Sequence, residues 1–430
     1  TLGFFGRINY DYQGKYLLEV NGRYDGTSRF LRNQRWSFFP SFSAGWNVAQ
    51  ENFWEPYRDY VSTFKIRGSW GELGNQNTKN WYPLYTIIDY KTNEGNWVLG
   101  ESRPNVAGIP ALISTTYGWE TVRSWNAGLD VTALKNRLNF TFDYFVRATY
   151  GMIGPAPELP QTLGAAVPKT NISDMESRGF EVMLSWKDKI GEDFRYGLTF
   201  TLADSRQKIL KYPNPSKSLG DKRDNWYEGR YDGDIWGYTT KGIAKTQAEM
   251  DAHLAKVNQS QLGSNWSAGD IMYEDLNGDG KISNGKNTVD DSGDLSIIGN
   301  KTPRYNYGIT LDASYKGFDF RLFLQGVGKR DFATSGSYFW GASGGKWQTV
   351  VFKEHLDYFR NDPNHPLGQN LDSYYPRPDW DSGRNRHTQT RYLQNAAYLR
   401  VKNIQLGYTI PQEVSEKIGI TNLRVYISGE

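Results

Sequence analysis

The sequence predicts an all-β protein, namely a segment of an antiparallel transmembrane β-barrel with about a dozen strands and long extracellular loops. Three observations favour this fold class. Apolar and polar residues alternate with a period of two along many segments, the connections between these segments alternate between short and long, and aromatic residues gather near the segment ends.

Composition narrows the classes of function. The chain has 430 residues, with 50 Lys and Arg against 47 Asp and Glu, and this near-balance gives no electrostatic case for nucleic acid as a partner. The absence of Cys excludes disulfides, thiol nucleophiles and Cys-ligated zinc. No run approaches the roughly 18 apolar residues that a transmembrane helix needs.

The alternation defines the strands in chain order. Residues 7–12 and 16–25 place Ile, Tyr, Leu and Val on one face and Arg, Asn, Glu and Asp on the other, with only residues 13–15 between them. The same pattern covers residues 138–144, 180–187 and 305–315. Several of these segments run longer than the usual strand of about five or six residues.

The connections indicate which end of the strands they occupy. Short links fall at residues 13–14, 135–136, 188–192 and 316–317. Long polar intervals span residues 26–36, 73–122, 149–175, 205–302 and 329–394. Short turns at one end and long loops at the other are typical of an outer-membrane β-barrel.

Aromatic residues lie near the strand ends, where a lipid-facing barrel has a belt of aromatic side chains at each membrane–water interface. Tyr10, Tyr12 and Tyr16 flank the first short link, and Tyr315 and Phe318 flank a later one. A soluble all-β protein such as a lectin-like sandwich also has alternating strands, so that alternative stays open at this point.

Two helices are predicted. Thr246 and Glu249 form a capping-box pattern ahead of a helix to about Val257, inside a long interval. We interpret it as a structural decoration, with a partner-docking helix as the alternative. Residues 412–418, after Pro411, predict a short helical turn filler on the short-link side.

One local motif predicts a metal. Asp275, Asn277, Asp279 and the carbonyl of Lys281 occupy ligand positions 1, 3, 5 and 7 of an EF-hand-like calcium loop. Position 12 is Lys286 where a carboxylate is wanted, so a longer loop would have to supply it. The residues that could do so are Asp290, Asp291 and Asp294. The sequence predicts a Ca²⁺ ion that stabilises the loop, and the alternative is a polar turn without metal.

Nothing else indicates catalysis, and we predict that the protein is not an enzyme. His253, His355, His365 and His387 are scattered without metal-ligand spacing and are expected to be solvated. Carboxylates on the polar strand faces could be taken for a glycosidase pair, but a polar barrel lining also explains them.

Rings in the long intervals are candidates for substrate capture, because a ring offers flat apolar area beside polar groups that fix orientation. Packing within the loops, or contact with a covering protein, is the alternative for any one ring. The candidate substrate-binding residues are Trp81, Tyr82, Trp97, Trp119, Trp236 and Trp340.

Several motifs follow one another in the order of a known family. They are the segments 5–12, 15–18, 23–30, Phe39-Pro40-Ser41-Phe42-Ser43-Ala44-Gly45-Trp46, 68–71, 74–76, Arg178-Gly179-Phe180-Glu181, the calcium-like loop leading to Ile298-Gly299, 317–326 and 398–408. With these motifs the chain resembles the barrel of SusC/RagA-type TonB-linked outer-membrane transporters of Bacteroidetes.

The resemblance implies a barrel of about 22 strands that holds a plug and lies in the outer membrane of a Gram-negative bacterium. It also implies energy from TonB, a SusD-like lipoprotein lid, and import of oligosaccharides or peptides. Residues 1–430 would be the barrel portion, with the plug, the TonB box and the final strands absent. Asp294 aligns with the family's closing acidic position. The alternatives are a passive outer-membrane porin and a soluble carbohydrate-binding β-protein.

Overall fold

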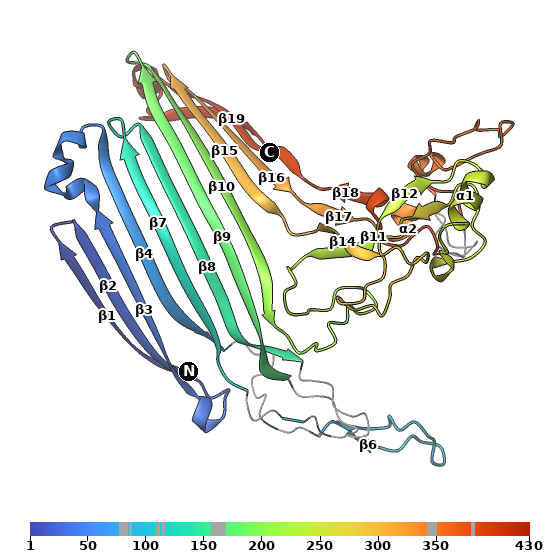
Figure 1. Cartoon of the computed structure of the whole chain (residues 1–430). Coiled ribbons are helices and arrows are strands. Elements are labelled where there is room, and N and C mark those ends of the chain that lie inside the picture. The colour runs from blue at the N-terminus through green and yellow to red at the C-terminus, as the bar shows by residue number, and fades with distance from the viewer. Residues whose placement is uncertain are drawn as a thin grey trace.

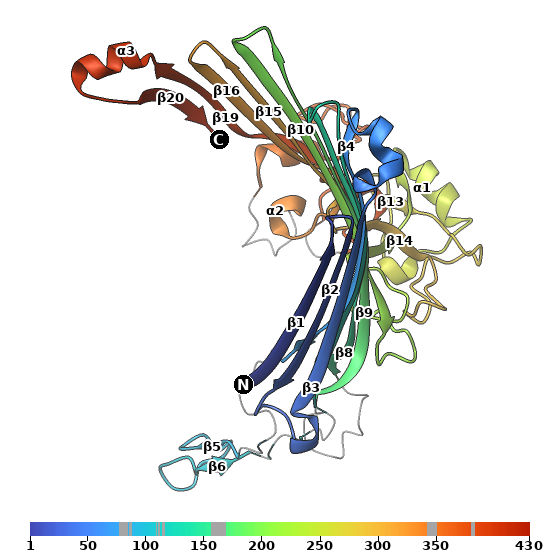
Figure 2. The ribbon, with the colours of Figure 1, turned by 90° about the vertical axis from the view of Figure 1, so that its left-hand side faces the viewer.

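A single curved sheet of twelve strands dominates the computed structural model (Figures 1 and 2). The structure describes residues 1–76, 85, 88–108, 110, 112–113, 117–155, 169–341, 351–379 and 383–430. Each strand of the large sheet pairs antiparallel with its neighbour, in the order β1-β2-β3-β4-β7-β8-β9-β10-β15-β16-β19-β20. The prediction of about a dozen antiparallel strands is confirmed.

The large sheet consists of β1 (Leu2–Tyr12), β2 (Tyr16–Gly26), β3 (Trp36–Asn47), β4 (Val61–Asn75), β7 (Glu120–Ala133), β8 (Leu138–Pro155), β9 (Lys169–Ile190), β10 (Phe194–Lys211), β15 (Arg304–Tyr315), β16 (Phe318–Lys329), β19 (Tyr398–Ile410) and β20 (Leu423–Gly429). The connections carry β5 (Tyr90–Lys91), β6 (Val106–Ala107), β11 (Asp234–Tyr238), β12 (Thr240–Ile243), β13 (Ile271–Tyr273), β14 (Leu295–Asn300), β17 (Asp331–Ala333) and β18 (Leu393–Asn395). The helices are α1 (Gln247–Leu254), α2 (Ser337–Trp340) and α3 (Gln412–Ser415). Short 3-10 turns are Arg32–Gln34, Val48–Gln50, Asn52–Tyr57, Ser260–Leu262, Lys353–Leu356, Thr390–Tyr392 and Glu416–Ile418.

The short links form tight turns at one end of the sheet, which we call the short-turn end. Tyr12 pairs with Tyr16 across the first turn, and Tyr315 pairs with Phe318 across the turn at Lys316. Gln13 and Lys316 adopt positive φ, as tight hairpins require. The loop-length pattern is therefore confirmed, and the predicted turn filler is present as α3 and the 3-10 turn that follows it.

The interval 149–175 is shorter than predicted. β8 continues to Pro155 and β9 begins at Lys169, so part of the expected loop is strand. The register of this pair shifts between Thr149 and Met152, which interrupts the period-two pattern. Because of this irregularity, alternation alone did not predict the ends of β8 and β9 next to this connection.

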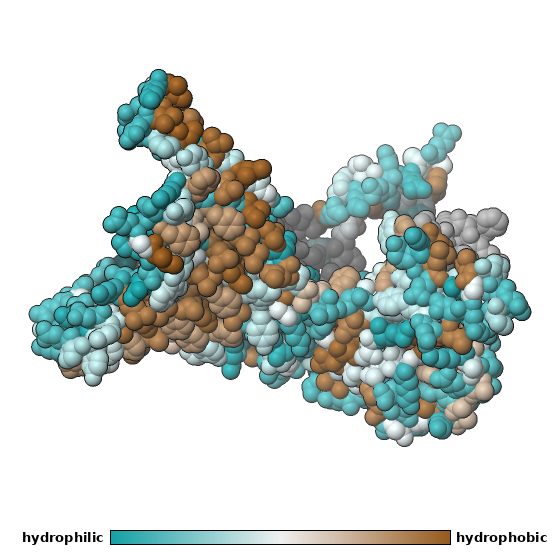
Figure 3. Space-filling view, turned by 90° about the horizontal axis from the view of Figure 1, so that it is seen from above, coloured by the Kyte–Doolittle hydropathy of each residue, from teal (hydrophilic) through white to brown (hydrophobic). Residues whose placement is uncertain are grey.

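The two faces of the sheet differ in chemistry. One cross-strand row runs Val20, Phe42, Trp70, Trp125 and Val146, so its side chains are apolar on five successive strands. The neighbouring row of the opposite face runs through Asn21, Ser41, Gly71, Ser124 and Arg147. In the view of Figure 3, brown hydrophobic side chains gather over the sheet, whereas teal dominates the part formed by the long connections. This is the apolar-outward, polar-inward pattern of a barrel wall.

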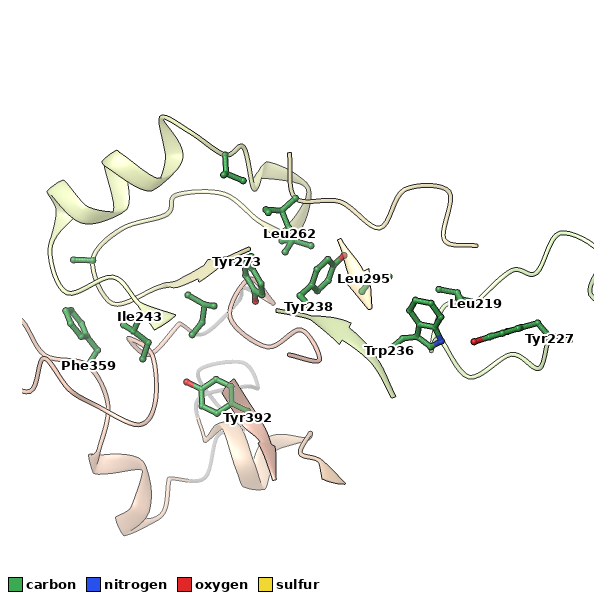
Figure 4. Packing of buried hydrophobic residues seen from close by; sticks show 14 residues of the cluster. Leu219, Tyr227, Trp236, Tyr238, Ile243, Leu262, Tyr273, Leu295, Phe359 and Tyr392 are labelled. Carbon is green, nitrogen blue, oxygen red and sulfur yellow. The ribbon is translucent and has the colours of Figure 1, made fainter. Parts of the chain in front are cut away.

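The connections β10–β15 and β16–β19 fold together into what we call the loop domain, the described residues of 212–303 and 330–397. Its hydrophobic core takes side chains from both connections, as Figure 4 shows for Tyr238, Tyr273, Phe359 and Tyr392. The core explains why connections of this length are ordered, since they bury their own apolar surface. In the described part of the chain no second sheet covers the apolar face of the twelve-stranded sheet, which disfavours the sandwich alternative.

The predicted helix in the loop domain is present and shorter. α1 ends at Leu254, three residues before the expected Val257. The Thr246 hydroxyl accepts from the backbone N–H of Glu249, but the Glu249 carboxylate accepts from Lys245 N rather than from the N-cap residue. Among the described residues, no helix combines the length and apolar character needed to cross a membrane.

Candidate functional site

The polar face of the sheet carries fixed charge and three hollows. Arg67 donates two hydrogen bonds to Asp143, both at 2.6 Å, and a third to Asp130 at 3.0 Å. These residues come from β4, β7 and β8, so one guanidinium joins three neighbouring strands. Hollows of about 1060, 540 and 480 Å³ lie along this face. The hollowed face is therefore the polar one, as expected for the inner wall of a barrel.

The calcium-like loop has the backbone geometry that its motif predicts. Asp275 accepts hydrogen bonds from the N–H groups of Gly278 and Gly280, both at 2.8 Å. Asn277 accepts from Asp279 N at 3.0 Å, and Asp279 accepts from Lys281 N at 2.8 Å. These side chains hold the loop in a tight coil whose remaining oxygen lone pairs are free for a cation.

Ile282 and Asp294 close the loop on the side of the domain core. Ile282, the apolar residue that follows the Lys281 ligand position, is fully buried. Asp294 is also fully buried and accepts from the N–H groups of Leu276 and Ser283, both at 2.8 Å. Burial raises the pKa of Asp294 above its usual range, backbone hydrogen bonds act against this, and the charge of Asp275 acts with it. The two carboxylates are thus near each other, as in a cation site.

The donor set suits a hard cation, because every candidate ligand is oxygen: Asp275, Asn277, Asp279, the Lys281 carbonyl and Asp294. Over the described ranges, however, no three acidic or His side chains are gathered closely enough to form a metal-holding group. The oxygen donors suit Ca²⁺, whereas the spacing of the acidic side chains in this structure does not form such a group. The ion stays a prediction.

The structure separates the candidate substrate-binding rings. Trp81 and Tyr82 lie outside the described residues. Trp97 is 58% exposed on the connection between β5 and β6. Trp119 donates from its indole to Arg35 O at 3.1 Å and makes edge contacts with Phe30 and Phe39. Trp119 therefore packs against residues in and beside β3, and its role in this structure is packing.

Trp236 corrects the prediction. Its ring is only 8% exposed and belongs to the core of the loop domain, so it offers no face to a ligand in this structure. Nothing in its local sequence separates it from the exposed Trp97, because burial here depends on packing between two distant connections.

Trp340 lines a pocket of about 240 Å³ in the loop domain. Its ring meets Tyr392 edge-on at a centroid distance of 4.8 Å, which fixes its orientation. Further lining residues that local sequence signals did not single out are His355, Tyr358, Tyr375, Arg377 and Arg386. Aromatic rings beside charged side chains, Arg377, Arg386 and Asp379, in one small pocket suit a single sugar unit or one peptide side chain.

The prediction that all four His are solvated is wrong for His253 and His355, which are buried, and for His387, which is half-buried against Tyr238 and Tyr273. His253 and His355 are each 8% exposed. His355 Nδ1 accepts from Phe352 N at 2.9 Å, and its Nε2 lies 3.1 Å from the carbonyl oxygens of Tyr338 and Phe339. His253 Nε2 lies 3.1 Å from Gln259 Oε1. These rings stabilise loop structure, so their burial reflects packing rather than catalysis.

We expect acid to destabilise the loop domain. Burial lowers the pKa of His253 and of His387. Above about pH 6.5 these groups are neutral in both states, whereas below it the unfolded chain takes up protons first. Stability is therefore complete above the unfolded pKa and is lost as the pH falls toward the folded values. Hydrogen exchange of the loop domain at pH 7.5 and pH 5 measures the effect.

The His253→Gln variant should lose part of this pH dependence, because burial lowers the pKa of His253. His365→Gln is the control variant, since the side chain of His365 is not buried in the core of the loop domain. Protection relative to the intrinsic exchange rate at each pH is the quantity to compare, and equal protection at both pH values in the unmodified protein would contradict the prediction.

Comparison with known proteins agrees with this geometry. A family model described as "TonB dependent receptor-like, beta-barrel" matches residues 1–428. TonB-dependent receptor P3 of Formosa agariphila is 28% identical over 439 residues, covering 99% of this chain and 40% of the relative. TonB-dependent receptor SusC of Bacteroides thetaiotaomicron is 27% identical, covering 95% and 38%. The chain thus spans about two fifths of the length of these relatives.

A solved structure described as that of the RagAB peptide transporter shares the fold. It superposes with a TM-score of 0.74 and 22% identity, over 99% of this chain and 43% of that one. At this identity the likeness concerns architecture: one long antiparallel wall with large connections at one end.

Proposed function

The chain belongs to the TonB dependent receptor-like β-barrel family, and from this premise we propose that it forms wall strands of an energised importer in the bacterial outer membrane. The whole protein would take up oligosaccharides or peptides with energy delivered through TonB. A SusD-like surface lipoprotein would act as its lid. The observation that carries the proposal is the twelve-stranded sheet with one continuous apolar face and one polar, hollowed face.

The two faces support passage of a hydrated solute. An apolar outer row contacts lipid without leaving polar groups unpaired, because the backbone bonds run between neighbouring strands. The polar inner row supplies Ser, Asn, Arg and carboxylate groups that replace water around a solute. A barrel of about 22 strands has a lumen wide enough to need a plug, so directional passage needs an external energy source.

The loop domain supports capture at the end of the sheet opposite the short turns. The pocket at Trp340 is bordered by Tyr358, Tyr375 and Arg377, and Trp340 itself packs against the core of the domain. This proposal assigns Trp340 to substrate contact and leaves Trp119 and Trp236 as packing residues. The chemistry of the pocket supports this assignment. Aromatic rings whose orientation is fixed by edge-on contacts, with cations beside them, suit sugars and peptide termini.

The test of function is uptake by cells that carry the full-length polypeptide. We expect labelled oligosaccharide or peptide to enter, and entry to stop when an uncoupler removes the proton gradient. Uptake that persists with the uncoupler would indicate a passive porin. A polypeptide that partitions into buffer without detergent would contradict the membrane assignment.

We also propose that Ca²⁺ binds the loop of Asp275, Asn277, Asp279, the Lys281 carbonyl and Asp294. The ion would stabilise the loop domain without taking part in transport chemistry. A ligand present at about 100 times its Kd stabilises the state that binds it by roughly 2.7 kcal/mol.

The calcium prediction is tested on the loop domain of the intact protein. Chelation should speed its proteolysis, and the Asp275→Asn variant should digest quickly with or without Ca²⁺. Asp290→Asn is the matched control, because Asp290 is exposed and pairs with Lys217 at 3.2 Å outside the ligand set. Digestion of the unmodified protein that is indifferent to chelation would rule the ion out.

A further inference from the structure

The largest of the three hollows described above is lined by residues of the short turns, such as Lys135 and Asn136, and of the strand ends beside them. This end of the sheet lies away from the loop domain (Figure 1). The volume of the hollow is about 1060 Å³. Three anionic side chains line it, and each is held by an Arg. Asp188 pairs with Arg137 at 3.0 Å, Asp312 with Arg321 at 2.7 Å and Asp319 with Arg424 at 2.9 Å. No carboxylate of the hollow is therefore left to neutralise a further cation.

Four more cations line the same hollow: Lys135, Lys187, Lys189 and Arg195. All four are exposed. In the part of the chain that the structure describes, none of them has an ion-pair partner. The hollow thus has an excess of positive charge, although the whole chain is nearly balanced.

The placement of these cations is unfavourable without an anion. Lys189 and Arg195 are direct cross-strand neighbours in the β9–β10 pair, and Lys187 lies on the same face opposite Gly197. Like charges at directly opposed positions destabilise a sheet. In a concave site of one sign the field is also focused toward the space above it, which raises the local concentration of anions.

We propose that this hollow binds anionic solutes during their passage, so that the preferred cargo is an oligomer bearing several carboxylates. The inference rests on the proposed transport function and names a substrate class for it. Rings of Lys or Arg along a pore favour anions in the same way. Lipid headgroups are not the ligand, because Lys187, Lys189 and Arg195 lie on the polar face and not on the apolar face. Sugar acids and acidic peptides share the required chemistry.

The experiment measures binding to the full-length protein in detergent by titration calorimetry. The probes are tetragalacturonate, tetraglutamate and the carboxyl-reduced, neutral form of the sugar tetramer. We expect one or both anionic probes to bind and to weaken as salt rises from 50 to 300 mM, since screening acts on exposed charges. The neutral tetramer should be insensitive to salt. Comparison of the two anionic probes distinguishes a sugar acid from a peptide.

The variant K187Q/K189Q/R195Q should weaken the anionic probe by about ten-fold, because three exposed charge interactions are removed. K211Q/K222Q/K241Q is the matched control, with the same loss of charge at exposed positions outside the hollow, and it should bind as the unmodified protein does. Circular dichroism checks that both variants keep their strands.

Two results would overturn the inference: anionic binding that is equal in the two variants, or no binding of either anionic probe. The second result would arise if another part of the polypeptide covered the cations. Uncoupler-sensitive uptake of some solute would still stand in either case, so failure here is distinct from failure of the proposed function.

Discussion

The Asp270→Ala variant is expected to open the loop domain while the strand sheet stays folded. Asp270 is fully buried, and its two oxygens accept from Arg377 at 2.8 and 2.9 Å, from Asn385 at 2.8 Å and from Ser267 N at 2.9 Å. Removing the carboxylate leaves these donors without their acceptor. We expect a loss of about 3 kcal/mol, since breaking a buried pair on one side is strongly unfavourable. Arg377 is 31% exposed, so water limits the loss.

Hydrogen exchange by mass spectrometry measures this effect, because local opening is reported separately for each peptide. Faster exchange is expected in α1 and around residues 383–389, with unchanged protection in β8 and β9. Asp372→Ala is the control, since Asp372 pairs with Lys245 at the surface and its side chain is 85% exposed. Equal protection in Asp270→Ala and the unmodified protein would show that the buried cluster does not hold the domain.

Much of the sheet could be predicted from sequence because strand faces repeat every two residues. The row from Val20 to Trp125 is apolar in sequence and lies on one face in space. The prediction failed where the backbone left that period. At Thr149 and Met152 the register shifts, so the pattern ends while the strand continues.

For the candidate site too, features formed by residues close in sequence could be predicted, whereas features formed by residues far apart in sequence could not. The calcium-like loop is predictable because Asp275, Asn277 and Asp279 hydrogen-bond within a few residues of themselves. Asp270 and Arg377 are 107 residues apart in the sequence, and no local sequence pattern predicts that they pair. The cation-lined hollow is similar, because Lys189 and Lys135 come together only through the strand order. Its charge was also hidden by a balanced overall composition.

The face assignment leads to a second large effect. Ile309 and Thr310 are neighbours in the middle of β15. Ile309 lies between Phe200 and Leu324 on the apolar face, whereas Thr310 lies between Thr199 and Phe323 on the polar face. In a bilayer, Ile309→Lys should destabilise the folded barrel by roughly 2–4 kcal/mol, because the ammonium would sit in the hydrocarbon region. The measurement is denaturant unfolding of the full-length protein in lipid vesicles.

Thr310→Lys is the matched control, with the same new side chain one residue away at the same depth. Its ammonium would enter the hollowed, polar side, where water and neighbouring carboxylates solvate it, so its cost should stay below about 1 kcal/mol. Because successive strand residues point to opposite faces, the pair compares lipid with lumen and holds depth, strand and charge constant. Equal losses would mean that both faces meet the same medium. A larger loss at Thr310 would mean that the face carrying Thr310 meets lipid and the face carrying Ile309 meets water. The exposed cations of the short-turn end would then not face a passing solute.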